Sequence, residues 1–396
     1  MIKFNNTYPP AKRGKIIVWG MISSFPFGGM IWQVLHHLVG FRRLGFDVWY
    51  VEDSDRYLKD PKTWWETNEY AASVEFLSQQ MRAIGFEDRW VFRPPERQDI
   101  CFGAVDRAGL DQLYKDADCV INLCGAQEAL PYHEIIQNRV YLETDPTIPQ
   151  IEIALGYKKT IDNYSRYQHI FTYGENIGND DCLLPVEKFQ WLPTRPPVIT
   201  DWWNPINAAP RYSKLTTISN WDTKHQGIKW KGEIYYWQKD FIRFIDLPRH
   251  SAIPLELTLG GISEKDENLI VKKGWLFKPA QEVVDIFRYN DYVCDTLGEF
   301  TVAKQLNVKA KSGWFSDRSV CYLAAGRPVI TEDTGFCKFV PTGKGLFAFR
   351  NTNDIITAID AIHSDYERHS KAAREIAEEY FKAEKVLGKI IDAIGL

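Results

Sequence analysis

Short runs of apolar, β-branched residues alternate along the chain with segments of helical periodicity. Lys15–Trp19 is such a run; a loop with Gly28 and Gly29, a helical pattern over residues 30–44 and a second apolar run at 47–51 follow it. A strand, a glycine-containing loop, a helix and another strand in this order predict parallel strands with helices on the faces of the sheet. Further strands are expected at 119–123, 139–142 and 169–172.

A proline-rich stretch, residues 191–210, separates this series from a second one. Proline interrupts both helices and central strands, so this stretch is expected to connect two domains. The second series begins with an apolar run at 215–219, and helical periodicity extends from Thr352 to the end of the chain. Its further strands are expected at 255–259, 300–303, 329–331 and 346–349.

The chain length of 396 residues agrees with two or three domains. The pattern divides it into an amino-terminal Rossmann-like α/β domain (1–195), a second one (196–365) and a terminal helix (366–396). In open parallel sheets ligands bind beyond the carboxyl ends of the strands. Two facing domains would therefore form one cleft from two sets of loops.

Composition narrows the choice of ligands. Lys+Arg of 48 against Asp+Glu of 52 gives a net charge of −4, which does not indicate nucleic-acid binding. Aromatic residues reach 14%, and their flat faces suit sugars or bases as well as cores.

Seven scattered cysteines without a C-x-x-C pair favour the cytoplasm. No apolar run approaches the ~18 residues of a membrane span, which leaves peripheral membrane contact open.

Two glycine-containing loops carry candidate chemistry. The first, residues 23–29, lacks the features of a P-loop and of a dinucleotide fingerprint. Gly28 and Gly29 form either an ordinary tight turn or a close approach for a ligand to backbone N–H groups at a helix start. The second lies at 311–336, where a polar loop, a short helix, Gly326 and Pro328 are followed by a strand and another polar loop.

The second region offers hydroxyl, guanidinium and carboxylate groups to a ligand. A guanidinium can bind phosphate with two parallel hydrogen bonds, and a carboxylate can hold sugar hydroxyls. The groups expected to bind are those of Ser316, Arg318, Ser319, Asp333 and Thr334.

These segments resemble the nucleotide-sugar glycosyltransferases of the B fold (GT-B). Pro26-x-Gly28-Gly29 and the helix after it look like their amino-terminal loop and helix, and residues 313–335 look like their donor-binding segment. Residues 372–381 are similar to the terminal helix that crosses back to the first domain. The resemblance implies two doubly wound Rossmann-like domains facing a cleft, with the acceptor on the first domain and the nucleotide sugar mainly on the second.

The resemblance also implies an activity. It is transfer of a hexose or pentose from a nucleotide diphosphate sugar, such as a UDP-sugar, to an unidentified acceptor, with no metal and no permanently bound cofactor. Cys321 stands where such enzymes often place a ribose-binding carboxylate, with Asp317 as a substitute. The donor-binding residues are then Gly28, Gly29, Asn220, Lys239, Lys304, Ser316, Asp317, Arg318, Ser319, Asp333, Thr334 and Gly335.

Candidate catalytic bases lie in the first domain. Asp145 follows the strand at 139–142 and is restricted by Pro146, so it is expected to face the cleft opposite the donor. Glu175, after the strand at 169–172, is the second choice. His36 and His37 lie inside the first helix, where packing is the expected role.

Three alternatives remain open. Asp53 and Asp55 form an Asp-x-Asp triplet of the kind that holds Mg²⁺ or Mn²⁺ against a diphosphate, although a solvated loop is the default. A noncatalytic two-domain protein could close over a sugar or nucleotide without turning it over. A sugar-nucleotide epimerase would isomerise the donor without any acceptor.

Overall fold

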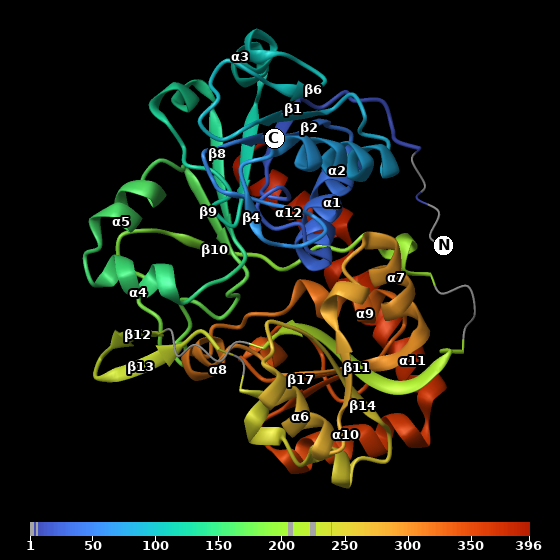
Figure 1. The fold of residues 1–396 in the computed structure, drawn as a ribbon. Coiled ribbons are helices and arrows are strands. Elements are labelled where there is room, and N and C mark those ends of the chain that lie inside the picture. Colours follow the sequence, from blue (N-terminus) through green and yellow to red (C-terminus); the bar gives the residue numbers. More distant parts are fainter. Residues whose placement is uncertain (1–3, 5–6, 205–208, 222–226, 239) are drawn as a thin grey trace.

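The structure is a computed structural model that describes residues 4, 7–204, 209–221, 227–238 and 240–396. Figure 1 shows two α/β domains, one above the other, each with helices packed around a sheet. The first domain carries an eight-stranded sheet and the second a six-stranded sheet. The expected α/β architecture of two parallel-sheet domains is therefore confirmed.

The first sheet has the strand order β10-β9-β8-β7-β1-β2-β5-β6, and its neighbouring strands are parallel except β5 and β6. All five strands expected here are present, because each apolar run is buried in the middle of the sheet. The strands are β1 (Lys15–Trp19), β2 (Asp47–Asp53), β5 (Trp90–Arg93), β6 (Phe102–Gly103), β7 (Cys119–Leu123), β8 (Asn138–Glu143), β9 (His169–Thr172) and β10 (Trp191–Pro193).

The second sheet has the order β15-β14-β11-β16-β17-β18, with every pair parallel. Its strand β16 differs from expectation, since it begins at Thr296 and ends at Thr301 rather than spanning 300–303. Two buried polar residues, Thr296 and Glu299, interrupt the apolar pattern over the first four residues of this strand. The strands are β11 (Tyr212–Asn220), β14 (Leu255–Gly260), β15 (Leu276–Pro279), β16 (Thr296–Thr301), β17 (Val329–Glu332) and β18 (Leu346–Phe349).

Helices cover both sheets, and two short hairpins project from them. No helix in the described part of the chain has the length and apolar character that a membrane crossing needs. The hairpins are β3 (Leu58–Lys59) with β4 (Glu66–Thr67), and β12 (Gly227–Trp230) with β13 (Glu233–Tyr236). The α-helices are α1 (Gly28–Arg43), α2 (Tyr70–Ala83), α3 (Arg107–Asp116), α4 (Ile148–Ala154), α5 (Lys158–Tyr164), α6 (Glu264–Lys272), α7 (Ile286–Asp295), α8 (Gln305–Ala310), α9 (Asp317–Ala324), α10 (Thr352–Ser364), α11 (Tyr366–Ile376) and α12 (Ala383–Ile394).

The end of the chain is not one continuous helix. A π-helical turn, Ala377–Phe381, and the extended residue Lys382 separate α11 from α12. Helix α11 packs on α9 and β18 of the second domain, whereas α12 packs on α1 of the first. Figure 1 shows α12, in red, among the blue elements of the first domain. The chain therefore crosses back to the first domain within residues 377–382.

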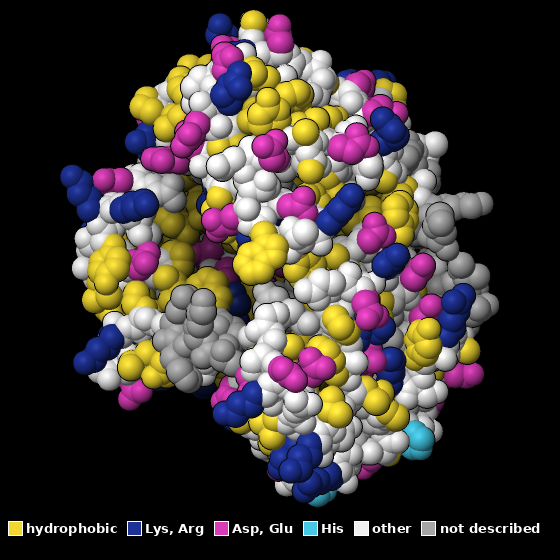
Figure 2. Space-filling model, viewed as in Figure 1, with side chains coloured by type: hydrophobic (Ala, Val, Ile, Leu, Met, Phe, Trp, Pro, Cys, Tyr) yellow, Lys and Arg dark blue, Asp and Glu magenta, His cyan; other side chains and the backbone are white. Residues whose placement is uncertain are grey.

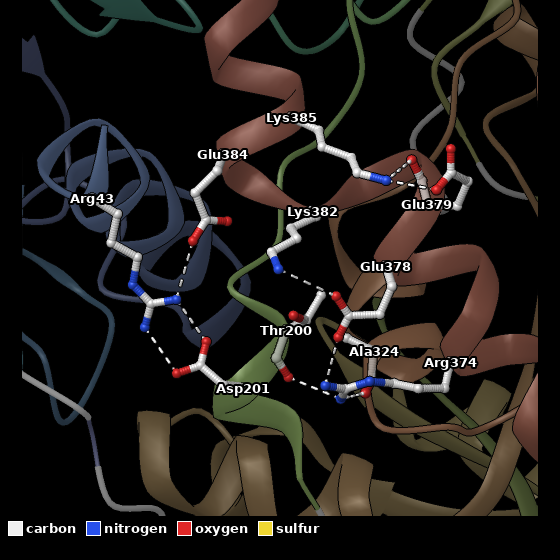
Figure 3. A network of polar contacts seen from close by, with 10 residues as sticks. All are labelled: Arg43, Thr200, Asp201, Ala324, Arg374, Glu378, Glu379, Lys382, Glu384 and Lys385. Atoms are coloured by element: carbon white, nitrogen blue, oxygen red, sulfur yellow. Dashed lines mark hydrogen bonds and ion pairs between the residues drawn. The ribbon is translucent and has the colours of Figure 1, made fainter. Parts of the chain in front are cut away.

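This return crossing lies beside the first connection between the domains. Val198 N donates to the carbonyl of Phe381 at 2.8 Å, and Ala383 N donates to the carbonyl of Val198 at 2.9 Å. Figure 3 shows how side chains fasten the two crossings: Arg374 of α11 donates to the carbonyl of Thr200 at 2.9 Å. The largest buried apolar cluster is also continuous from one domain to the other.

Candidate functional site in the interdomain cleft

Loops beyond the carboxyl ends of the two sheets meet between the domains. Figure 2 shows the surface hollowed here, left of centre, with hydrophobic and acidic side chains on the walls of the hollow. Trp314 Nε1, from the second domain, donates to the carbonyl of Thr144, after β8, at 2.9 Å. Asn176 N, after β9, donates to the carbonyl of Ser312 at 3.0 Å. The predicted cleft therefore exists, and both sets of strand-end loops border it.

Asp145 and Lys304 form an ion pair across this boundary. Asp145 comes two residues after β8, and Lys304 is the N-cap residue of α8, three residues after β16. Lys304 Nζ lies 2.5 Å from Asp145 Oδ2 and 3.9 Å from the centre of the Trp237 ring. Asp145 Oδ1 is buried and has no hydrogen-bond partner among the described residues. The expected base and an expected phosphate ligand thus lie together, with one carboxylate oxygen still able to accept a proton donor.

A second carboxyl group, Asp317, lies at the start of α9. Gln33 Nε2, from α1 of the first domain, donates to Asp317 Oδ2 at 3.0 Å. The pKa of Asp317 is raised to about 7, mainly by burial; the negative charge of Asp145 contributes to this rise, and the hydrogen bond from Gln33 opposes it. The carboxyl group is therefore partly protonated near neutral pH.

The residues around Asp317 on α9 are mostly committed to the fold. Ser316 is the N-cap, and its hydroxyl accepts from Arg318 N at 3.3 Å. Arg318 pairs with the buried Glu299 and donates to the carbonyl of Ile218 at 2.8 Å. The structure thus places the guanidinium inside the second domain rather than on the wall of the cleft.

The hydroxyl of Ser319, one residue further along α9, is differently placed. Its Oγ is buried and has no hydrogen-bond partner in the described part of the chain. Binding of phosphate by Ser316, Arg318 or Ser319 remains a prediction, and for Arg318 it would require exchange of the internal partners.

The loop after β17 is a tight turn. Asp333 Oδ1 accepts from Gly335 N at 2.8 Å, and Asp333 Oδ2 accepts from Arg350 Nη2 at 2.8 Å. Thr334 Oγ1 donates to the carbonyl of Trp314 at 2.5 Å. Gly335 has φ +94°, a left-handed conformation that favours glycine. These contacts give the loop a defined shape beside the cleft, and its contact with a sugar remains a prediction.

The two glycines before α1 have different surroundings. A Cβ on Gly28 would lie 2.7 Å from Cδ2 of Tyr289 and 2.9 Å from the carbonyl oxygen of Val284, both in the second domain. No atom would lie within 4 Å of a Cβ on Gly29. Gly28 therefore permits close contact of the domains, and the start of α1 remains open at Gly29.

Asn220 is the other expected donor residue that the structure describes, and it lies in the second sheet. It is the exposed last residue of β11, at the carboxyl end of the sheet where ligands bind in such folds. Lys239 lies outside the described residues.

Glu175 takes part in an ion pair of its own. Its Oε2 lies 2.5 Å from Arg195 Nη2, and the Arg195 guanidinium lies over the rings of Tyr380 and Phe381. Burial raises the pKa of Glu175, and Arg195 opposes that shift. The pair stands where the chain crosses back, which suits a structural role better than a catalytic one.

The two histidines of α1 are buried, as expected for packing. His36 stacks on Trp32, with 5.4 Å between ring centroids, and its Nδ1 accepts from Ile199 N at 3.1 Å. Cys321 Sγ lies 3.9 Å from His36 Nε2. Burial lowers the pKa of His36 and raises that of Cys321, so both are neutral. The position that resembles a ribose-binding site is thus packed against the first domain.

The Asp-x-Asp triplet is also internally paired. Asp53 is buried against Arg93 and accepts from the Tyr114 hydroxyl at 3.1 Å, and Asp55 accepts from Arg93 Nη1 at 2.8 Å. Among the described residues no group of three or more His, Cys, Asp or Glu side chains is arranged to hold a metal ion. Arg93 thus holds the place next to Asp53 and Asp55 that a metal ion would take if the triplet were a metal site.

Three residues at this site were not expected from the sequence: Gln33, Trp237 and Trp314. Gln33 could have been found, since it is a polar residue on the buried, mostly apolar face of α1, where the only other buried polar side chains are His36 and His37. Trp314 lies next to predicted donor residues and contacts the opposite domain. No local pattern distinguishes a tryptophan that bridges two domains from one in a core.

The fold can be compared with known proteins. No protein-family model and no curated protein matches the sequence. Solved structures match it over nearly the whole chain. An alpha-glucosyltransferase in complex with UDP-glucose and DNA containing an abasic site has 12% identity and a TM-score of 0.61, covering 97% of this chain and 100% of that one. AviGT4, a glycosyltransferase involved in avilamycin A biosynthesis, has 12% identity and a TM-score of 0.56, covering 96% and 97%. HepE from Anabaena, in complex with UDP and glucose, has 12% identity and a TM-score of 0.55, covering 96% and 99%.

These similarities define the class of fold. At 12% identity, a match over 96–97% of the chain shows a shared architecture. The chain has the two-domain GT-B fold, as the resemblance implied.

Proposed function

We propose that the protein is a glycosyltransferase that moves a sugar from a nucleotide diphosphate sugar to an acceptor bound in the interdomain cleft. The observation that carries the proposal is the Asp145–Lys304 pair, in which an acid from the first domain and a cation from the second meet at the strand ends. A fold alone does not define an activity. The neighbours solved with UDP or UDP-glucose support UDP-sugars as the first donors to test.

The pair suits the two halves of a transfer reaction. The Lys304 ammonium can stabilise the negative charge that develops on the leaving nucleoside diphosphate. Asp145 can accept the proton of the acceptor hydroxyl, because its Oδ1 has no described partner. A bound diphosphate would compete with Asp145 for Lys304, so donor binding would release the carboxylate for the acceptor. The donor would therefore bind before the acceptor.

The first test is donor binding. UDP, GDP, ADP and UDP-glucose are compared by thermal shift and calorimetry; a ligand at about 100 times its dissociation constant adds about 2.7 kcal/mol to the free energy of unfolding. Lys304→Met should weaken binding. Lys309→Met, in the helix that Lys304 caps, removes a pair with the exposed Glu233 of β13 and should not weaken it. Absence of binding by every nucleotide would reject the proposal.

The second test is turnover. Asp145→Asn should reduce transfer by about 10²–10⁴-fold with little change in donor affinity, the usual effect of losing a general base. Glu175→Gln is the comparison, and a larger loss in that variant would make Glu175 the base. Donor that stays intact with every acceptor would favour a noncatalytic binder, and isomerised donor would favour an epimerase.

We also propose that transfer needs no metal. Asp53 and Asp55 both pair with Arg93, and Arg107 Nη1 lies 3.8 Å from Asp53 Oδ1, so cationic side chains already face both carboxylates. Activity should therefore survive EDTA, and loss of activity that Mn²⁺ restores would contradict this part of the proposal.

A further inference from the structure

The β3–β4 hairpin holds an aromatic side chain far into solvent. Trp65, just before β4, is 78% exposed, the highest value among the large hydrophobic residues that the structure describes. Its neighbours Lys62, Thr63 and Glu66 are exposed and polar. The hairpin thus presents one flat apolar face with polar groups around it.

The turn that carries Trp65 is well fastened. Asp60 Oδ1 accepts from Lys62 N at 2.9 Å and from Thr63 N at 2.7 Å. Asp60 N donates to the carbonyl of Trp65 at 3.0 Å. Trp64 has φ +63°, which is unusual for a bulky residue and marks a turn whose shape the surrounding contacts determine. The backbone that carries the exposed ring is therefore already ordered, which lowers the entropy cost of binding a ligand to it.

The hairpin lies beside the strand-end loops of both domains. The Trp64 ring meets the ring of Phe27, the N-cap residue of α1, edge-on at 4.9 Å. A Cβ on Gly260, at the carboxyl end of β14 in the second domain, would lie 3.9 Å from Trp64. Trp64 Nε1 is buried with no partner among the described residues. Trp65, the next residue in the chain, is thus held beside strand-end regions of both domains, the edge of each sheet where we propose that donor and acceptor bind.

From this geometry we propose that Trp65 is the stacking surface for a saccharide acceptor; the inference rests on the proposed function. The apolar face of a sugar ring covers an indole, and its rim of hydroxyls matches Lys62, Thr63 and Glu66. A single indole offers at most about 250 Å². A stable protein interface needs about 800 Å² from each partner, so a sugar fits this small patch better than a protein does.

The test uses the whole protein, saturated with UDP, on an array of oligosaccharides that contains hexose, N-acetylhexosamine and uronic acid residues. The strongest binder is then titrated against three variants. Trp65→Ala should lose about tenfold or more in affinity, and Trp65→Tyr, which keeps a ring, should recover part of it. Tyr157→Ala, which removes a half-exposed ring elsewhere on the first domain, should bind like the wild type.

The outcomes separate the inference from the proposed function. UDP affinity should be the same in Trp65→Ala and the wild type. A wild type that binds no UDP would reject the proposed function, and with it the role of Trp65 as an acceptor surface. No saccharide bound on the array, or equal affinity of Trp65→Ala and the wild type, overturns the inference. A wild-type dimer that Trp65→Ala dissociates also overturns it, because the ring would then bind a second copy of the chain.

Discussion

Arg318 shows at the scale of one residue how burial changes what a side chain can do. Its partner Glu299 is completely buried, so Arg318→Ala would leave a carboxylate without its cation inside the second domain. Such a loss costs about 3–5 kcal/mol of unfolding free energy. Arg97→Ala, which removes an exposed pair with Asp99, should leave the free energy of unfolding nearly unchanged. Chemical denaturation measures both; an Arg318→Ala variant of normal stability that has lost UDP affinity would instead support the phosphate role.

Asp317 gives the folded protein a pH dependence with a defined sign. Its pKa of about 7 in the folded state lies above the ordinary value, so between about pH 4 and pH 7 the folded chain keeps a proton that the unfolded chain releases. As the pH rises through this window, the free energy of unfolding should therefore fall by at most about 1.4 kcal/mol per pH unit. Above about pH 7 it should level off. Asp317→Asn, which stays neutral, should remove this contribution. Urea denaturation of both proteins at several pH values measures the difference, and parallel curves would contradict the prediction.

The candidate site shows which residue properties a sequence reveals. Asp145 and Lys304 could be predicted to lie at the cleft because each follows a recognisable strand, and strand ends of parallel sheets gather at one edge. That they pair with each other depends on how two domains close, which no local pattern contains. Arg318 can bind phosphate and lies in the segment predicted to bind the donor. Its guanidinium instead points to the buried Glu299, in the part of β16 that no apolar run marks in the sequence.

Helix packing at the element scale depends on one missing side chain. A Cβ on Gly40 of α1 would lie 2.4 Å from Cδ1 of the buried Leu387 and 3.0 Å from Cβ of Ala383, both in α12. No atom would lie within 4 Å of a Cβ on Gly388, also in α12. Gly40→Ala should therefore lower the free energy of unfolding by about 1–3 kcal/mol. Gly388→Ala should raise it by about 0.5–1 kcal/mol through helix propensity. Two changes of the same sign in urea denaturation would contradict this packing.

The strands that the sequence predicted are those with a continuous apolar run. The apolar strands were located within a few residues, because burial on both faces leaves a continuous apolar run. The terminal helix was predicted as one piece, whereas the structure divides it at Ala377–Phe381. At this break the backbone of Val198 forms hydrogen bonds with Phe381 and Ala383. These contacts join distant parts of the chain, and no proline or glycine marks the break in the sequence.

The arrangement of the whole molecule depends on close contact of backbones between the domains. A Cβ on Gly313 would lie 2.4 Å from the backbone nitrogen of Asn176, in the opposite domain. No atom would lie within 4 Å of a Cβ on Gly343. Both glycines have positive φ, +81° and +93°, so alanine costs about 1–2 kcal/mol of backbone strain at either position.

Only Gly313→Ala should in addition separate the domains, because Asn176 cannot move away without breaking its bond to Ser312. We expect this variant to show a larger radius of gyration in small-angle scattering and weaker donor binding. Gly343→Ala should lose stability alone. If both variants scatter like the wild type, the backbone adjusts locally around Gly313 and Asn176, and this contact does not control closure of the cleft. If both expand, the cause is the backbone strain that they share.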